Sequence, residues 1–182
     1  MFLKILDNLF ICDSDARNDL SKDFFHSFSF VLDFAYDSFD STHKIQEKEL
    51  CGSPLIWNIH PPPPPPHHHP IAHDNKVDIH TSRLYKCLGS IVLRMHFELT
   101  RSNLVLIFIG SCLSMYSYAM TIIVAYLMYR YNIGVLKAIK KMDEYEGLTT
   151  NISKWENMIP SLLLFERDIL LKNNGWMDNI VE

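Results

Sequence analysis

The amino-acid sequence predicts an α/β fold in which helices flank a central, mostly parallel and twisted sheet. Residues 103–109 form a continuous and mainly branched apolar run, which is typical of a central parallel strand covered on both faces. Residues 84–99 carry apolar side chains at helical spacing, and residues 155–171 do the same. Because strands and helices alternate along the chain, the pattern is that of an α/β layer fold.

Three elements are expected in the first part of the chain. Residues 4–10 are expected to form a short edge strand, and the apolar residues 28–34 a buried strand. Between them, residues 15–22 are expected to form a small helix.

A long helix is expected to begin at Asp78 or Thr81, either of which is a suitable N-cap, and to run to about Thr100. Apolar side chains recur along one face of it at helical spacing: Leu84, Leu88, Ile91, Met95 and Leu99.

The strand at 103–109 follows this helix, and residues 117–130 are then expected to form a buried helix. Two amphipathic helices are expected at 135–145 and 155–171. The apolar face of the second consists of Trp155, Ile159, Leu162, Phe165 and Ile169.

Length and composition indicate one globular domain and exclude several kinds of partner. The 182 residues suffice for one hydrophobic core, and 48% apolar with 21% charged residues is ordinary for a globular protein. The net charge of −4 gives no basic face for nucleic acid or anionic lipid. The four cysteines lack CxxC spacing, so we expect no zinc site, no disulfide framework and no cofactor. A reducing location, the cytoplasm or the nucleus, fits them best.

Residues 61–70 differ from the rest of the chain, with six prolines, three histidines and a last proline. Six consecutive prolines form a polyproline II rod and cannot lie in a core sheet or helix. We therefore expect one domain at 1–172, interrupted by an exposed loop at about 51–70 and followed by a tail at 173–182. The loop is either a tolerated low-complexity insertion or a docking site for an SH3 or WW module, with weak metal binding by the histidines as a further alternative.

Residues 103–129 contain no charged side chain, which is long enough for a membrane-spanning helix. A buried strand, a turn and a buried helix explain the same residues. The first half is β-branched, residues 110–112 mark a break, and serines and tyrosines dilute the apolar centre. We favour the strand and helix, and expect no membrane span.

Residues 121–128, Thr-Ile-Ile-Val-Ala-Tyr-Leu-Met, resemble the helix that follows the catalytic loop of dual-specificity protein phosphatases, which are cysteine-based protein tyrosine phosphatases. Counted back from this segment, the family's loop His-Cys-x-x-Gly-x-Ser-Arg-Ser falls on residues 111–119. Further segments resemble the family's first strand, first helix, second strand, general-acid stretch and closing helix, in that order: 5–10, 16–20, 30–35, 72–79 and 155–170. This resemblance over nearly the whole chain implies the fold of that family.

The resemblance also implies a set of site residues. Cys112 takes the position of the nucleophilic cysteine. Asp74, with Asp78 as second choice, takes that of the aspartic acid that protonates the leaving oxygen. Ser114, Ser117 and Tyr118 would belong to the phosphate-binding loop.

Most of that loop departs from the family pattern. Tyr118 stands at the position of the arginine that binds two phosphate oxygens, and Met115 at the position of the loop glycine. Ser111 replaces the histidine before the cysteine, and Ala119 replaces the hydroxyl that the family uses beside the cysteine. By analogy with arginine fingers, losing the charged clamp costs about 10³- to 10⁵-fold in rate. Met115 also obstructs the close backbone approach that a glycine permits.

A second alignment register stays open. Residues 105–109 also resemble the strand end that leads into the family's cysteine, so that Ile109 would replace the cysteine and the loop would gain three residues. In either register the arginine is missing, because Arg101 and Arg130 flank the region and nothing between them is basic.

These losses predict a catalytically inactive relative, a pseudophosphatase, that acts in signalling by binding a protein partner such as a phosphoprotein, a kinase or a phosphatase. Two alternatives stay open. One is an active but divergent protein phosphatase with Cys112 as its nucleophile, and the other is a single-pass membrane protein that spans residues 103–129.

Overall fold

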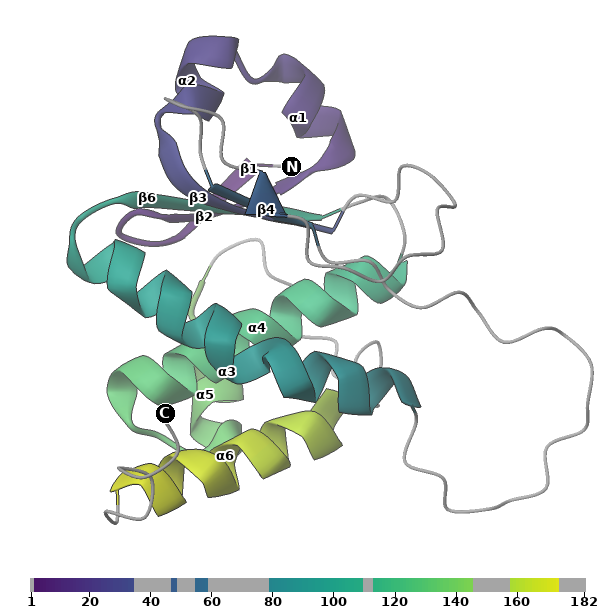
Figure 1. Cartoon of the computed structure of the whole chain (residues 1–182), viewed down its shortest axis with the longest axis vertical. Coiled ribbons are helices and arrows are strands. Elements are labelled where there is room, and N and C mark those ends of the chain that lie inside the picture. Colours follow the sequence, from purple (N-terminus) through teal and green to yellow (C-terminus); the bar gives the residue numbers. More distant parts are fainter. Residues whose placement is uncertain are drawn as a thin grey trace, which may run out of the picture.

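The structure, a computed structural model, describes residues 2–34, 47–48, 55–58, 79–109, 113–145 and 158–173. Within this part of the chain, one sheet separates two layers of helices (Figure 1). The short helices α1 (Ser14–Asp19) and α2 (Lys22–His26) lie on one face. The other face is covered by the remaining helices: α3 (Ile79–Thr100), α4 (Leu113–Tyr131), α5 (Val135–Met142) and α6 (Ile159–Asn173). The predicted α/β architecture is confirmed.

The described strands form one six-stranded sheet in the order β1-β2-β6-β3-β5-β4. They are β1 (Phe2–Leu6), β2 (Leu9–Asp13), β3 (Phe28–Asp33), β4 (Glu47–Lys48), β5 (Leu55–Asn58) and β6 (Leu104–Ile109). The pairs β2–β6, β6–β3 and β3–β5 are parallel, and the edge strands β1 and β4 pair antiparallel to their neighbours. The sheet is therefore mostly parallel, as predicted.

Strand β6 is the centre of the molecule and is buried on both faces. Its side chains alternate between two apolar clusters, as the period of a strand requires. Val105, Ile107 and Ile109 pack toward the long helices, whereas Leu106 and Phe108 pack toward α1 and α2. The interpretation of 103–109 as a central parallel strand is confirmed.

The uncharged run 103–129 is divided between β6 and α4. Since residues 104–109 form a strand, the interpretation of 103–129 as one spanning helix is wrong. Helix α4 is apolar on all sides because it is buried on all sides, and residues 119–128 are almost without exposed surface. Among the described helices, no single one is long and apolar enough to cross a membrane, although α4 from Tyr116 and α5 would pass as a pair bent by 112°.

The predicted single edge strand at 4–10 is wrong, because the structure has a hairpin of β1 and β2 instead. Asp7 and Asn8 form its turn, and Asn8 has φ = 68°. Asparagine tolerates this left-handed conformation better than most residues, so a polar Asp-Asn pair inside an apolar run is a turn signal.

The predicted helix at 15–22 is two helices, α1 and α2. The division falls at Ser21, whose side chain accepts a hydrogen bond from the Phe24 N–H at 3.2 Å and so caps α2. The helices predicted at 135–145 and 155–171 are confirmed as α5 and α6, with ends that differ by a few residues.

The exposed loop predicted at about 51–70 is wrong for residues 55–58. Residues 55–58 form β5, which pairs with β3 inside the sheet, and Leu55 is buried. Residues 61–70 lie outside the described part of the chain, so the role of the proline and histidine run stays a prediction.

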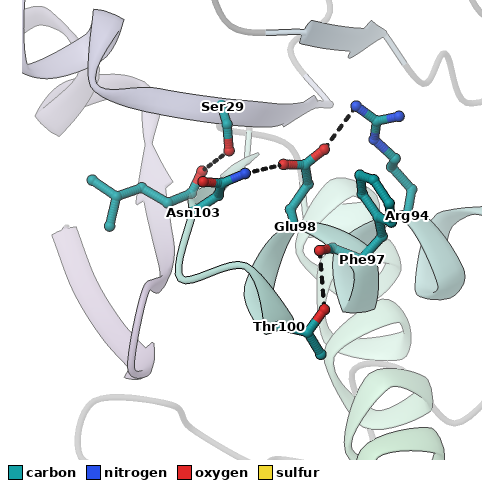
Figure 2. Close-up of polar contacts among 7 residues, drawn as sticks. Ser29, Arg94, Phe97, Glu98, Thr100 and Asn103 are labelled. Carbon is teal, nitrogen blue, oxygen red and sulfur yellow. Dashed lines mark hydrogen bonds and ion pairs between the residues drawn. The ribbon is translucent and has the colours of Figure 1, made fainter.

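A polar network fixes the turn from α3 into β6 (Figure 2). The Glu98 carboxylate is buried, accepts a hydrogen bond from Asn103 Nδ2 at 2.7 Å, and pairs with Arg94 Nη2 at 2.7 Å. Asn103 N–H also donates to the Glu98 carbonyl at 3.1 Å, and Ser102 between them has φ = 61°. The left-handed residue lets the chain reverse after α3 and enter the sheet.

Asp13 caps α1, because its Oδ1 accepts a hydrogen bond from the Ala16 N–H at 2.9 Å. Burial would raise the pKa of Asp13, but the Ala16 N–H, the positively charged N-terminal amine and the Asp15 N–H outweigh it and hold the pKa below its ordinary value. A lowered pKa means that this stabilisation is present above the unfolded-state pKa and is lost as the pH falls through the folded-state pKa.

We therefore expect Asp13→Ala to lower the free energy of unfolding by about 1 kcal/mol at neutral pH. The difference from the parent should shrink in acid, where Asp13 is protonated in both states. Asp13→Asn is the control, since it keeps a capping oxygen that does not titrate. Urea unfolding at neutral and acid pH measures all three proteins. If Asp13→Ala lowered the free energy of unfolding equally at both pH values, the capping role of the carboxylate would be contradicted.

Candidate functional site

The parallel strands β2, β6 and β3 end together at one edge of the sheet. In this register Asp13 lies opposite Ile109 on β6, and Asp33 lies opposite Phe108. Helix α4 begins at Leu113, after residues 110–112. Ligands of open α/β sheets bind outside the carboxyl ends of the strands, so this edge is the candidate site.

The structure places only some of the predicted site residues. Cys112 and Asp74 lie outside the described residues, so their predicted roles as nucleophile and general acid stay predictions. Ser114 lies in the first turn of α4, and its side chain is not among those described. Ser117 and Tyr118 also lie on α4, and both are buried.

Tyr118 points into the core beside the sheet edge. It is 6% exposed, and its ring stacks on Phe34 with centroids 6.4 Å apart and planes inclined by 13°. Phe34 directly follows β3 and is held there because its N–H donates to the Phe108 carbonyl at 2.9 Å. The position assigned to the arginine is therefore filled by an aromatic pair. Sequence reasoning missed Phe34 as its partner.

Helix α4 begins at Leu113, four residues before the start predicted from the sequence at Ser117. The first four N–H groups of an α-helix have no acceptor within the helix, and those that follow donate to the carbonyl four residues back. The N–H groups of Ser117 and Tyr118 are thus engaged within α4. The Ser117 carbonyl also accepts a hydrogen bond from Thr121 Oγ1 at 2.8 Å.

The two arginines that flank the uncharged run lie away from this edge. Arg101 precedes β6, at the opposite end of that strand, and its guanidinium lies over the Phe97 ring at 3.7 Å. Arg130 is in the last turn of α4, about 25 Å along the helix from Leu113. Neither arginine substitutes for the missing one.

Asp13 and Asp33 stand at this end of the strands on either side of β6. Within the described part of the chain, no three His, Cys, Asp or Glu side chains are grouped so as to hold a metal ion.

No protein-family model matches this chain, and no curated protein matches it in sequence. Solved structures do match in fold. A leucine-rich-repeat and phosphatase-domain protein from Entamoeba histolytica is 17% identical with a TM-score of 0.58, and the match covers 94% of each chain. PTPMT1 is 12% identical with a TM-score of 0.58, over 96% of this chain and 99% of that one. Human DUSP28 is 12% identical with a TM-score of 0.54, over 91% and 95%.

These matches span almost the full length of both partners in each comparison. The chain therefore has the fold of the dual-specificity phosphatases, and the resemblance found in the sequence is confirmed at the level of the fold. The candidate site lies where the central strand β6 ends and helix α4 follows it.

Proposed function

We propose that this chain, which has a dual-specificity-phosphatase fold, is a catalytically inactive member of that fold class and acts in signalling by binding a protein partner. The observation that carries the proposal is Tyr118. Its ring is buried against Phe34 at the position where catalysis needs an exposed arginine. A forked guanidinium that binds two phosphate oxygens has no counterpart in a buried phenol.

A further observation supports inactivity. No basic residue lies between Arg101 and Arg130 in the sequence, and both of these lie away from the site.

Phosphate release from a phosphotyrosine peptide and a phosphothreonine peptide tests the proposal. We expect the purified chain to release phosphate at least about 10³-fold more slowly than an active dual-specificity phosphatase, because the charged clamp is absent. The Cys112→Ser variant is the matched control, and it should give the same background as the parent. Release at a family-like rate that Cys112→Ser abolishes would overturn the proposal.

The active alternative rests on Cys112, which follows the central strand in the sequence where this fold carries its nucleophile. Activity requires a thiolate near neutral pH. Iodoacetamide at neutral pH, followed by mass spectrometry of the peptides, distinguishes the two functions. Selective and rapid alkylation of Cys112 favours the active enzyme, whereas alkylation no faster than that of the other cysteines favours the inactive protein.

The proposed partner is a phosphoprotein, a kinase or a phosphatase, met in the cytoplasm or nucleus. Titration of the chain with phosphorylated and unphosphorylated forms of one peptide library asks whether phosphate contributes to binding. N–H groups at the start of an α-helix bind anions weakly without an arginine, so some phosphate contribution is compatible with an inactive protein.

A further inference from the structure

Two large apolar side chains lie exposed on the outer surface of α3. Leu93 is 44% exposed and Phe97 is 42% exposed, whereas Met95 on the opposite side of the helix is fully buried. Leu93 and Phe97 are four residues apart, so they are neighbours on the helix surface. Arg94 and Arg101 both lie beside Phe97. We call the surface formed by Leu93, Arg94, Phe97 and Arg101 the α3 face.

Both arginines of the α3 face lie over the Phe97 ring. The guanidinium carbon of Arg101 is 3.7 Å from the ring centroid, and that of Arg94 is 5.5 Å from it (Figure 2 shows Arg94 beside Phe97). The face of an aromatic ring attracts a guanidinium. Because this contact uses the plane of the guanidinium, the N–H donors at its edge stay available for a carboxylate.

The α3 face is positively charged in a chain whose net charge is −4. Residues 79–101 contain four lysine or arginine residues and one acidic residue, Glu98. The Glu98 side chain is 5% exposed and is already engaged by Arg94 and Asn103. Within the described part of the chain, no carboxylate forms an ion pair with the exposed Arg101. A partner that fits this surface is therefore acidic.

The α3 face continues into a groove of about 480 Å³ between α3 and α6. Leu93 belongs to both, and the rest of the apolar lining includes Val92, Tyr129, Phe165 and Ile169. Gly89 leaves a notch in the groove, because a Cβ added there would meet no atom within 4 Å. The lining holds one lysine, Lys86, and one aspartate, Asp168. The groove thus adds apolar surface and no net charge.

We propose that the α3 face binds an acidic segment of a protein partner, which places a large apolar side chain in the groove and a carboxylate on Arg101. Gly89 and Phe97 are about 12 Å apart along α3, and Arg101 follows one turn later. One short segment therefore reaches both the groove and Arg101. Arginine and aromatic side chains beside an apolar pocket are the usual centres of binding energy in protein interfaces.

The occupant is a protein segment and not a lipid surface. Binding to anionic lipid typically uses a cluster of about four to eight basic side chains. The α3 face has two arginines, of which Arg94 already pairs with Glu98. An apolar groove beside one unpaired arginine suits a peptide that offers one apolar anchor and one carboxylate. The proposal goes beyond the proposed function and does not depend on whether the chain is catalytically inactive.

Selection of random peptides displayed on phage against the full chain, followed by calorimetric titration of the selected peptides, tests the proposal. We expect the selected sequences to share an acidic residue near a large apolar one. Arg101→Glu should weaken their binding at least about 10-fold, because it replaces the partner of the carboxylate with a like charge. Lys137→Glu, at an exposed position of α5, is the matched control, since it changes the net charge equally. It should leave the affinity within about twofold, as a distant surface charge is screened.

The proposal is overturned if the selection yields no acidic peptide, or if Arg101→Glu leaves the affinity of the selected peptides unchanged. Equal weakening by Arg101→Glu and Lys137→Glu would reveal attraction by net charge alone and would also overturn it. Vesicles of phosphatidylcholine and phosphatidylserine form the last arm. If the parent binds them and Arg101→Glu does not, the α3 face binds a lipid surface, and the proposal of a protein partner is wrong.

Discussion

Tyr118→Arg, which restores the arginine of the phosphatase loop, is expected to destabilise the protein and to produce no phosphatase activity. We expect the free energy of unfolding to fall by about 3–5 kcal/mol, which is the range for a buried charge without a partner. The phosphate release rate should stay at the background of Cys112→Ser.

The loss of stability follows from where the side chain lies. Tyr118 is 6% exposed on α4, and its ring stacks on Phe34. Arginine at this position loses the aromatic contact and brings a guanidinium into the core, where removal from water costs several kcal/mol. Activity stays absent because Met115 still occupies the position of the loop glycine.

Urea unfolding measures the stability, and phosphate release is assayed under conditions where the variant is folded. Tyr118→Phe is the control. It keeps the stacked ring and removes only the hydroxyl, so we expect the free energy of unfolding to fall by only about 1 kcal/mol. If Tyr118→Arg were as stable as the parent, the buried placement of residue 118 would be wrong. If Tyr118→Arg released phosphate at a family-like rate, the missing arginine alone would account for the inactivity. The other departures of the loop from the family pattern, such as Met115, would then have no effect on catalysis.

Glu98→Ala is expected to lower the free energy of unfolding by about 2–4 kcal/mol, because it removes one partner of a largely buried ion pair and hydrogen-bond network. The Glu98 side chain is 5% exposed and accepts from both Arg94 and Asn103 (Figure 2). Without it, the Asn103 amide loses its acceptor at the entry to the central strand. The Arg94 side chain is 36% exposed, so water replaces part of its lost interaction.

Thr100→Ala is the matched control on the same helix. Thr100 is exposed and its hydroxyl donates to the His96 carbonyl at 2.8 Å, so we expect a change within about 0.5 kcal/mol. A double-mutant cycle of Glu98→Gln with Arg94→Met isolates the ion pair from the contact with Asn103. Equal stability of Glu98→Ala and Thr100→Ala in urea would show that the network does not hold the turn.

The elements that local pattern predicted well are those whose burial is uniform along their length. Strand β6 reads as branched apolar residues because both of its faces are covered, and α3 repeats its apolar side chains because one face packs on the sheet. The hairpin at Asn8 and the cap at Ser21 were missed, since each depends on one short polar residue inside a longer apolar or helical pattern. Strand β5 was missed because it has only four residues and lies next to the proline-rich run.

Of the candidate site, the sequence by itself determined the absence of the arginine, because no basic residue lies between Arg101 and Arg130 in any alignment register. It also determined the α/β class, because apolar periodicity is a local property of the chain. Only the tertiary structure decided what fills the vacant position and what surrounds it. Tyr118 meets Phe34 across 84 residues of sequence, and Asp13 and Asp33 reach the end of β6 only when three parallel strands align. Such contacts join distant segments, and no local pattern encodes which segments will pair.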